Sequence, residues 1–180
     1  MMNIWHDIDS RRVTPEKFTA VIEISKGKKN KYELDKETGL LKLDRVLYTS
    51  MHYTANYGFI PKTYAEDNDP LDVLVLCSES ILPMTIVECY PVGILYMVDG
   101  DEKDEKIVAI PVTEPTLSAH KDISDLPPHI FNEMKHFFEV YKLLEDKSTM
   151  IQRIGDAAEA RACIEKCMGL YNEKFGVKEN

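Results

Sequence analysis

The sequence predicts an α+β fold in which one β-rich barrel or curled sheet packs against helices. Three observations support this prediction. Apolar and β-branched runs are concentrated before residue 113, two stretches with helical periodicity follow residue 125, and 44% of the residues are hydrophobic. A chain of 180 residues is expected to form one domain, spanning residues 1–180, and to bury about 70% of its unfolded surface without disulfide bonds.

Five segments carry the pattern of β-strands: residues 18–25, 31–34, 72–76, 85–98 and 106–112. In the first segment, Ile22 and Ile24 share one face and Glu23 lies on the other, where an exposed glutamate needs no functional explanation by itself. The third segment is a nearly continuous apolar run, typical of a buried strand. The last two segments are joined by a charged turn over residues 99–105.

Two helices are predicted after these strands. Asp125 offers a capping carboxylate for the first helix, and Pro127 and Pro128 suit its first turn. Its apolar stripe comprises Ile130, Met134, Phe137, Tyr141 and Leu144. The second helix begins at a capping box over residues 156–159 and ends near Gly176. Its apolar stripe comprises Ala160, Ile164, Cys167 and Tyr171.

The charge balance argues against several classes of partner. With 22 basic and 31 acidic side chains the net charge is −9, whereas nucleic-acid binders need a basic surface. No apolar run approaches the roughly 18 residues that cross a bilayer. The first residues also lack the basic flank and long apolar stretch of a signal peptide. We therefore expect a cytoplasmic protein without nucleic-acid or membrane partners.

The sharpest local signal is the acidic segment DNDPLD, residues 67–72, which leads into an apolar strand. Three carboxylates within six residues (Asp67, Asp69 and Asp72) repel one another and are best tolerated around a cation. The alternative is an acidic turn exposed to solvent. In a random sequence, three aspartates at this spacing would more often form such a turn than a metal site. An EF-hand does not fit, because its glycine and glutamate positions are occupied by Asp72 and Ser78. The rigid strand behind the segment favours a metal site.

Other candidate residues carry less information alone. The acidic turn over 99–105 would by itself be solvated, but beside the first cluster it becomes a second source of metal ligands. Taken alone, Tyr141 is better explained as a core tyrosine, and Lys142 as a side chain that extends to water. Cys163 and Cys167 lie one helical turn apart, and buried free thiols are favoured there over a zinc site. Motifs for nucleotide phosphate loops, dinucleotide binding, serine hydrolases and HExxH metalloproteases do not occur.

The sequence resembles the family I soluble inorganic pyrophosphatases of the compact microbial type. The segment DNDPLDV, residues 67–73, matches the acidic signature of this family. The resemblance continues in order through VIEISKG (21–27), KYELDKETG (31–39), Asp44-Arg45, NYGFIP (56–61), PVG (91–93), the turn with Asp99, Asp104 and Lys106, and HFFEVYK (136–142). It therefore covers most of the chain.

The resemblance implies a fold and a set of residue roles. The fold would be a compact closed β-barrel, OB-like with about five strands, with two flanking C-terminal helices, and the chain would assemble as a homohexamer. Asp69 would be the base beside the attacking water. The implied metal ligands are Asp67, Asp72, Asp99 and Asp104, with Glu23 at a more peripheral ion. The phosphates would be held by Lys31, Arg45, Tyr57, Tyr141 and Lys142, and Glu33, Tyr53 and Lys106 would complete the site.

The expected activity is hydrolysis of inorganic pyrophosphate to two orthophosphates. Pyrophosphate is multiply negative, so carboxylates alone would repel it. Several Mg²⁺ ions, for which Mn²⁺ or other divalent ions could substitute, would share the carboxylates with the substrate and activate a water. Two alternatives stay open: another metal-dependent phosphohydrolase, and a non-catalytic metal-binding β-barrel.

Overall fold

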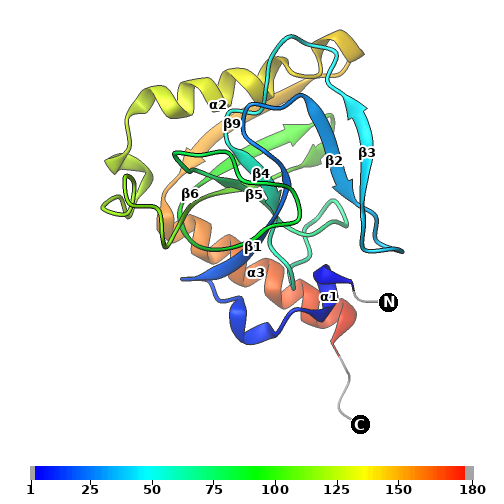
Figure 1. The fold of residues 1–180 in the computed structure, drawn as a ribbon, viewed down its shortest axis with the longest axis vertical. Coiled ribbons are helices and arrows are strands. Elements are labelled where there is room, and N and C mark those ends of the chain that lie inside the picture. Colours follow the sequence, from blue (N-terminus) through cyan, green and yellow to red (C-terminus); the bar gives the residue numbers. More distant parts are fainter. Residues whose placement is uncertain (1–2, 177–180) are drawn as a thin grey trace.

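Five strands pair into a ring in the computed structural model, which describes residues 3–176 (Figure 1). The ring runs through β1 (Phe18–Ile24), β4 (Asn56–Phe59), β5 (Asp72–Val75), β8 (Lys106–Pro111) and β6 (Ile86–Asp99), and β6 pairs again with β1. Strands β5 and β8 are parallel, and the other pairs are antiparallel. Strands β7 (Glu102–Lys103) and β9 (Thr149–Gly155) add to β6. The predicted α+β class is confirmed.

A separate hairpin, formed by β2 (Asn30–Leu34) and β3 (Leu41–Val46), lies beside the ring, at the right of Figure 1. Together with the short helix α1 (Ile4–Asp7), it covers the second face of β1. Val21 on that face packs in one apolar cluster with Trp5 and Leu34. All seven residues of β1 are therefore buried, and the expectation of an exposed Glu23 is wrong.

Two helices of the C-terminal half pack against the ring: α2 (Pro128–Val140) and α3 (Ala157–Phe175). The predictions for α3 are confirmed: it begins at the capping box of Asp156 and Glu159, its apolar stripe is buried, and its C-cap is Gly176. Among the helices of residues 3–176, none combines the length and the apolar character needed to cross a bilayer. The described part of the chain also contains three short 3₁₀ helices: η1 (Ser10–Arg12), η2 (Ile123–Asp125) and η3 (Leu143–Glu145).

Helix α2 differs from its prediction at both ends. Its N-cap is Pro127, which makes no side-chain cap, whereas Asp125 belongs to the capping box of the preceding 3₁₀ turn. Tyr141 is the C-cap, so Tyr141 and Lys142 follow the helix rather than lying late in it. Leu144 is 67% exposed and does not belong to the apolar stripe. The earlier end of α2 allows Tyr141 and Lys142 to leave the helix axis.

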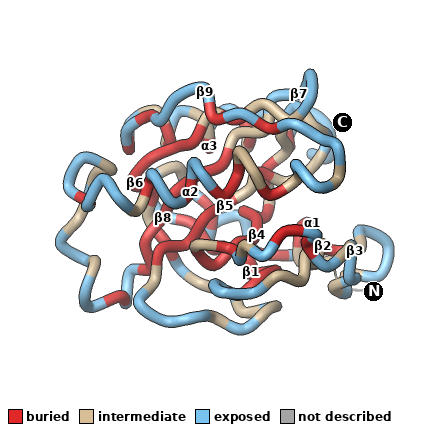
Figure 2. Tube along the Cα trace, turned by 90° about the horizontal axis from the view of Figure 1, so that it is seen from above, coloured by how far each residue is buried: buried red, intermediate tan, exposed pale blue. Residues whose placement is uncertain are grey.

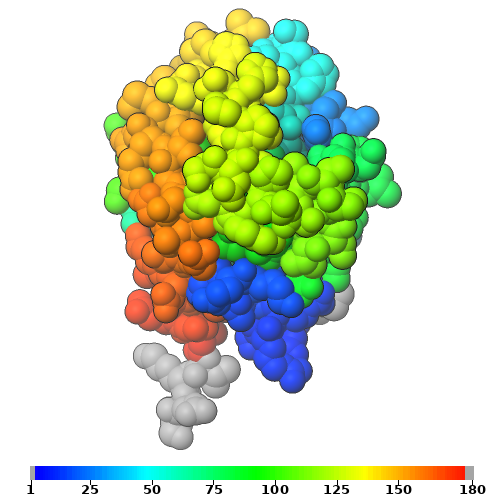
Figure 3. Space-filling view, turned by 90° about the vertical axis from the view of Figure 1, so that its left-hand side faces the viewer, coloured from blue at the N-terminus to red at the C-terminus, as the bar shows by residue number. Residues whose placement is uncertain are grey.

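Successive residues of the ring strands point to opposite faces, and they belong to two apolar clusters. One cluster includes side chains of α2, and the other includes side chains of α3. Leu74 and Phe137 belong to the cluster that includes α2, and Val73 and Ile164 belong to the cluster that includes α3. The burial of the ring strands is plain in Figure 2. Figure 3 shows the side on which α2, the 112–127 connection and α3 meet. The ring is thus a rigid support, and charged side chains gather where the hairpin approaches it.

Candidate active site

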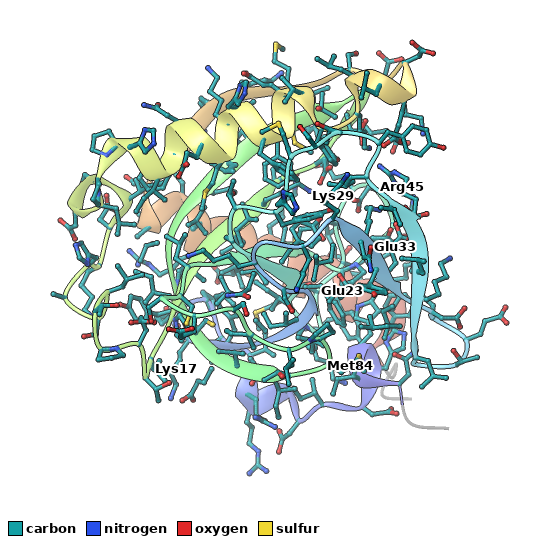
Figure 4. The ribbon with its side chains drawn as sticks, turned by 45° about the horizontal axis from the view of Figure 1, so that its top comes forward. Lys17, Glu23, Lys29, Glu33, Arg45 and Met84 are labelled. Atoms are coloured by element: carbon teal, nitrogen blue, oxygen red, sulfur yellow. The ribbon has the colours of Figure 1, made fainter. Side chains whose placement is uncertain are left out.

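A cavity of about 520 Å³ lies between the β2–β3 hairpin and the acidic loop that precedes β5. Eight of the predicted site residues line it: Glu23, Lys31, Glu33, Tyr57, Asp67, Asp69, Asp72 and Asp99. Glu23 and Glu33 lie close together, with Arg45 beyond them on β3 (Figure 4). Of the remaining predicted residues, Arg45 is paired with Lys31 across the β2–β3 hairpin, and the others reach this group through hydrogen bonds or ring contacts, as described below.

A buried lysine joins two of the predicted metal ligands. The parallel register of β5 and β8 places Asp72 opposite Lys106. The Nζ atom of Lys106 lies 2.7 Å from Oδ2 of Asp72 and 2.6 Å from Oδ1 of Asp104. Tyr57 donates a hydrogen bond to Asp72 and accepts one from Lys106 at 3.2 Å. The strand pairing thus brings together residues that are distant in the sequence.

The charges around Lys106 depend on one another. Burial lowers the pKa of Lys106, but Asp104 and Asp72 outweigh burial and raise it well above its usual value. Burial raises the pKa of Asp104, and Asp72 contributes to this, while Lys106 opposes it. Because the Lys106 side chain is only 2% exposed, an uncompensated ammonium there would be costly. The two carboxylates keep it charged.

The acidic loop holds Asp67 and Asp69 in different surroundings. The backbone N–H of Asp69 donates to Oδ1 of Asp67 at 3.1 Å, and its carbonyl accepts from Ala65 at 2.8 Å. Burial raises the pKa of Asp67 to about 6, and repulsion from Asp72 and Asp104 adds to this shift. The Asp69 side chain is half-exposed. A cation near Asp67 would favour its charged form, and it would thus oppose both the burial and the repulsion that raise its pKa.

Glu23 lies at an irregularity in the pairing of β1 with β4. The register shifts between Ile22 and Ile24, so the intervening Glu23 has no partner across the ladder. Its Oε1 atom accepts the N–H of Leu34 at 2.7 Å. Burial raises the pKa of Glu23 to about 8, with repulsion from Asp72 as the next cause. The carboxyl group therefore faces the other acidic residues from inside the fold.

The hairpin supplies cationic groups to the opposite side of the cavity. Lys31 pairs with Glu33 and lies 3.4 Å from Asp44. Arg45 donates from Nε to Oε1 of Glu145 at 3.0 Å, and its Nη1 bonds Asp44. Its Nη2 atom is buried and has no hydrogen-bond partner within residues 3–176. The existing contacts of Arg45 therefore leave one guanidinium nitrogen unused as a donor within the described part of the chain.

The predicted tyrosines form an aromatic wall beside Lys106. The ring centroids of Tyr53 and Tyr57 lie 5.4 Å apart, those of Tyr53 and Phe137 lie 4.9 Å apart, and those of Phe137 and Tyr141 lie 5.2 Å apart. Burial raises the pKa of all three tyrosines, so they are neutral hydroxyl groups at physiological pH. Lys142, next to Tyr141, pairs with Asp99 at the end of β6. These contacts bring the remaining predicted residues to the same region.

The carboxylates fit hard divalent ions in their chemistry. Within residues 3–176, no three His, Cys, Asp or Glu side chains form a ready-made metal site as they stand. Instead, ammonium groups pair with Asp72, Asp104, Asp99 and Asp69. Oxygen donors are the ligands that Mg²⁺ and Ca²⁺ prefer, and the raised pKa of Asp67 shows that positive charge would stabilise this group. The donor set therefore fits such ions.

Several residues that line the cavity are not among the site residues that the sequence predicts. Trp5, Lys36, Lys42 and Glu102 also line it, and Glu145 binds Arg45 from outside. Nothing in the spacing of these residues distinguishes them from ordinary core or surface positions. Among the segments that carry the family resemblance, KYELDKETG (31–39) contains one of these residues, Lys36. The roles assigned to the predicted site residues stay predictions.

Comparison with known proteins identifies the family. The family model described as inorganic pyrophosphatase matches residues 20–172. A soluble inorganic pyrophosphatase of Zea mays is 47% identical over 93% of this chain and 78% of its own length. The crystal structure of the inorganic pyrophosphatase from Thermus thermophilus superposes with a TM-score of 0.91 at 37% identity, covering 95% of this chain and 99% of that one. That from Helicobacter pylori has a TM-score of 0.88 at 41% identity, covering 92% and 99%. The chain belongs to the inorganic pyrophosphatase family.

Proposed function

We propose that this chain hydrolyses inorganic pyrophosphate to two orthophosphates and that it uses bound divalent ions, Mg²⁺ above all. The observation that carries the proposal is the arrangement of one cavity in a member of this family. Carboxylates from the acidic loop and from β1, β5 and β6 meet lysines there. A group that binds cations thus lies beside a group that binds anions.

The anion-binding side follows from the hairpin and the aromatic wall. Arg45 offers a planar set of donors, of which the buried Nη2 has no partner within residues 3–176. Lys31 and Lys142 add compact positive charges, and Tyr57 and Tyr141 add hydroxyl groups without charge. A substrate with two phosphate groups is suited to a cavity with several separate donors. Phosphoryl transfer depends chiefly on such positioning and charge neutralisation.

The cation-binding side would consist of Asp67, Asp72, Asp99 and Asp104, with Glu23 more peripheral. Divalent ions supply charge neutralisation and lower the pKa of a coordinated water when they are bound. Lys106 would keep Asp72 and Asp104 in place through its two short contacts. Asp69, which is half-exposed at the cavity, would orient the attacking water and accept its proton.

Three further features belong to the same proposal. The ring of five strands would be a closed OB-like β-barrel, and the chain would be a cytoplasmic homohexamer. Exposed apolar side chains at Leu82, Met84 and Ile86 support assembly, because subunit contacts would remove them from water. Light scattering coupled to size-exclusion chromatography tests the subunit number directly.

The activity is tested by colorimetric measurement of orthophosphate release from pyrophosphate, with and without Mg²⁺ and chelator. We expect release with Mg²⁺ and its loss on chelation. A parallel panel of nucleotides and phosphoesters tests the alternative of another metal-dependent phosphohydrolase. Binding of ions in calorimetry without any hydrolysis would instead support a non-catalytic metal-binding protein.

A further inference from the structure

The tip of the β2–β3 hairpin brings a lysine to Asp69. The ammonium group of Lys36 donates a hydrogen bond to Oδ1 of Asp69, 33 residues away along the chain. Both side chains are about half-exposed, at 49% and 51%. Lys36 lines the same cavity as the predicted site residues, but neither its sequence pattern nor the function proposed above assigns it a role.

The Asp69 side chain depends on this contact more than its backbone does. Two hydrogen bonds fix the Asp69 backbone, one to Asp67 and one from Ala65. Within residues 3–176, the carboxylate itself accepts a hydrogen bond only from Lys36. A half-exposed aspartate without that bond is free to rotate among its rotamers. The orientation of the carboxylate is therefore set from the hairpin.

Lys36 is itself held by the N-terminal segment. The Nδ2 atom of Asn3 donates to the carbonyl oxygen of Lys36 at 2.8 Å. The ammonium group lies 5.6 Å from the centroid of the Trp5 ring, within the range of a cation–π contact. Trp5 is only 4% exposed and donates from Nε1 to the carbonyl of Thr63 at 2.9 Å. Helix α1 thus connects the hairpin tip to the buried core.

We infer that Lys36 is a positioning residue for hydrolysis: it holds one oxygen of Asp69 so that the other faces the attacking water. This inference rests on the proposed function of Asp69 as the base. A base contributes fully only when it is within hydrogen-bond reach of the proton that it accepts. Lys36 supplies that orientation from a separate segment of the chain, and Asn3 and Trp5 keep the lysine in place.

The decisive variants are Lys36→Gln, which removes the charge, and Lys36→Arg, which keeps it. Lys17→Gln is the matched control, because Lys17 forms a similarly exposed ion pair with Glu88 (57% and 49%) at the end of β1 away from Glu23 (Figure 4). Half-exposed ion pairs add little to stability, so all three variants should fold. Melting curves and circular dichroism check this.

The expected result is a split between turnover and substrate binding. For Lys36→Gln, kcat should fall about tenfold, because a small misplacement of a reacting group has a large effect on rate. The KM for pyrophosphate should stay within about twofold of wild type, because Lys36 is not assigned to the substrate. Lys36→Arg should keep kcat within about threefold, and Lys17→Gln should match wild type.

Two kinetic outcomes would overturn the inference. One is a kcat for Lys36→Gln that is the same as wild type. The other is a raised KM with unchanged kcat, which would make Lys36 a substrate ligand instead. If the wild-type protein releases no orthophosphate, the proposed function fails rather than this inference.

Crystals of metal-free protein then test whether Lys36 positions Asp69. We expect one conformer of the Asp69 side chain in wild type and Lys36→Arg and several in Lys36→Gln. A single conformer in Lys36→Gln would refute it.

Discussion

Glu145 and Arg45 are joined by a hydrogen bond of 3.0 Å between Oε1 and Nε, although 100 residues separate them in the sequence. The Glu145 side chain is only 9% exposed. It lies in η3, shortly after Tyr141 and Lys142. This hydrogen bond constrains the guanidinium group through Nε, and its Nη2 atom has no hydrogen-bond partner among the described residues 3–176. Glu145 therefore constrains the guanidinium group that the proposed function assigns to the phosphates.

We expect Glu145→Gln to raise the KM for pyrophosphate about tenfold, because a hydrogen bond between two charged groups is stronger than one to a neutral amide. Turnover at saturating substrate should change less. Steady-state kinetics over a range of pyrophosphate concentrations measures both. Glu139→Gln is the control, since Glu139 pairs with Lys135 on the surface of α2. An unchanged KM in Glu145→Gln would show that Arg45 needs no such support.

Arg45→Lys tests the guanidinium itself. The substitution keeps the charge but removes the planar set of donors, and the shorter reach of lysine loses either Glu145 or the phosphate. We predict that kcat/KM falls by about tenfold or more. The measurement is the initial rate at limiting pyrophosphate. Equal rates for Arg45→Lys and wild type would mean that only the charge of this residue matters.

Asp69→Asn tests the base. Asparagine keeps the shape of the side chain but cannot accept a proton, so kcat should fall by more than about 10². The exposed Asp101→Asn in the turn after β6 provides a control with the same change of charge. Near-normal turnover of Asp69→Asn across the pH range would remove the residue from this role.

Local patterns in the sequence are sufficient to predict those elements whose structure is determined by local interactions. The capping box of Asp156 and Glu159 predicted the start of α3, and the alternation of residues 18–25 predicted β1. Strands β3, β4 and β9 lie outside the predicted segments. Strand β4 is short and contains Gly58, and a glycine normally weakens a strand. The structure needs this glycine: a Cβ atom there would lie 1.9 Å from the carbonyl oxygen of Val21.

The site was predictable only in part for the same reason. Asp67, Asp69 and Asp72 lie close in the sequence, so their repulsion could be recognised from spacing alone. The contact between Asp72 and Lys106 depends on the parallel register of β5 and β8, which no local pattern encodes. The family resemblance assigns both residues to one site but does not specify their contact. In the sequence, Lys36 and Glu145 cannot be distinguished from ordinary charged residues of the surface. Their partners become visible only in three dimensions.

Glu23 makes the stability of the metal-free protein depend on pH. Its pKa is raised from 4.5 to about 8 in the folded chain, first by burial and then by Asp72. The folded state therefore holds this proton more tightly than the unfolded state. The contribution to stability is complete below the unfolded value of 4.5, and it is lost as the pH rises through about 8. Asp67, with a pKa raised to about 6, acts in the same direction over a lower range.

We therefore predict that the melting temperature of the wild-type protein in chelator falls between about pH 5 and pH 8. Glu23→Gln should reduce this fall, because glutamine can still accept the N–H of Leu34 but has no charge to bury. Divalent ions should raise the melting temperature more at the higher pH, because they bind the deprotonated carboxylates. Scanning calorimetry with and without Mg²⁺ measures both effects. Identical pH dependence in wild type and Glu23→Gln would mean that Glu23 does not take up the proton on folding.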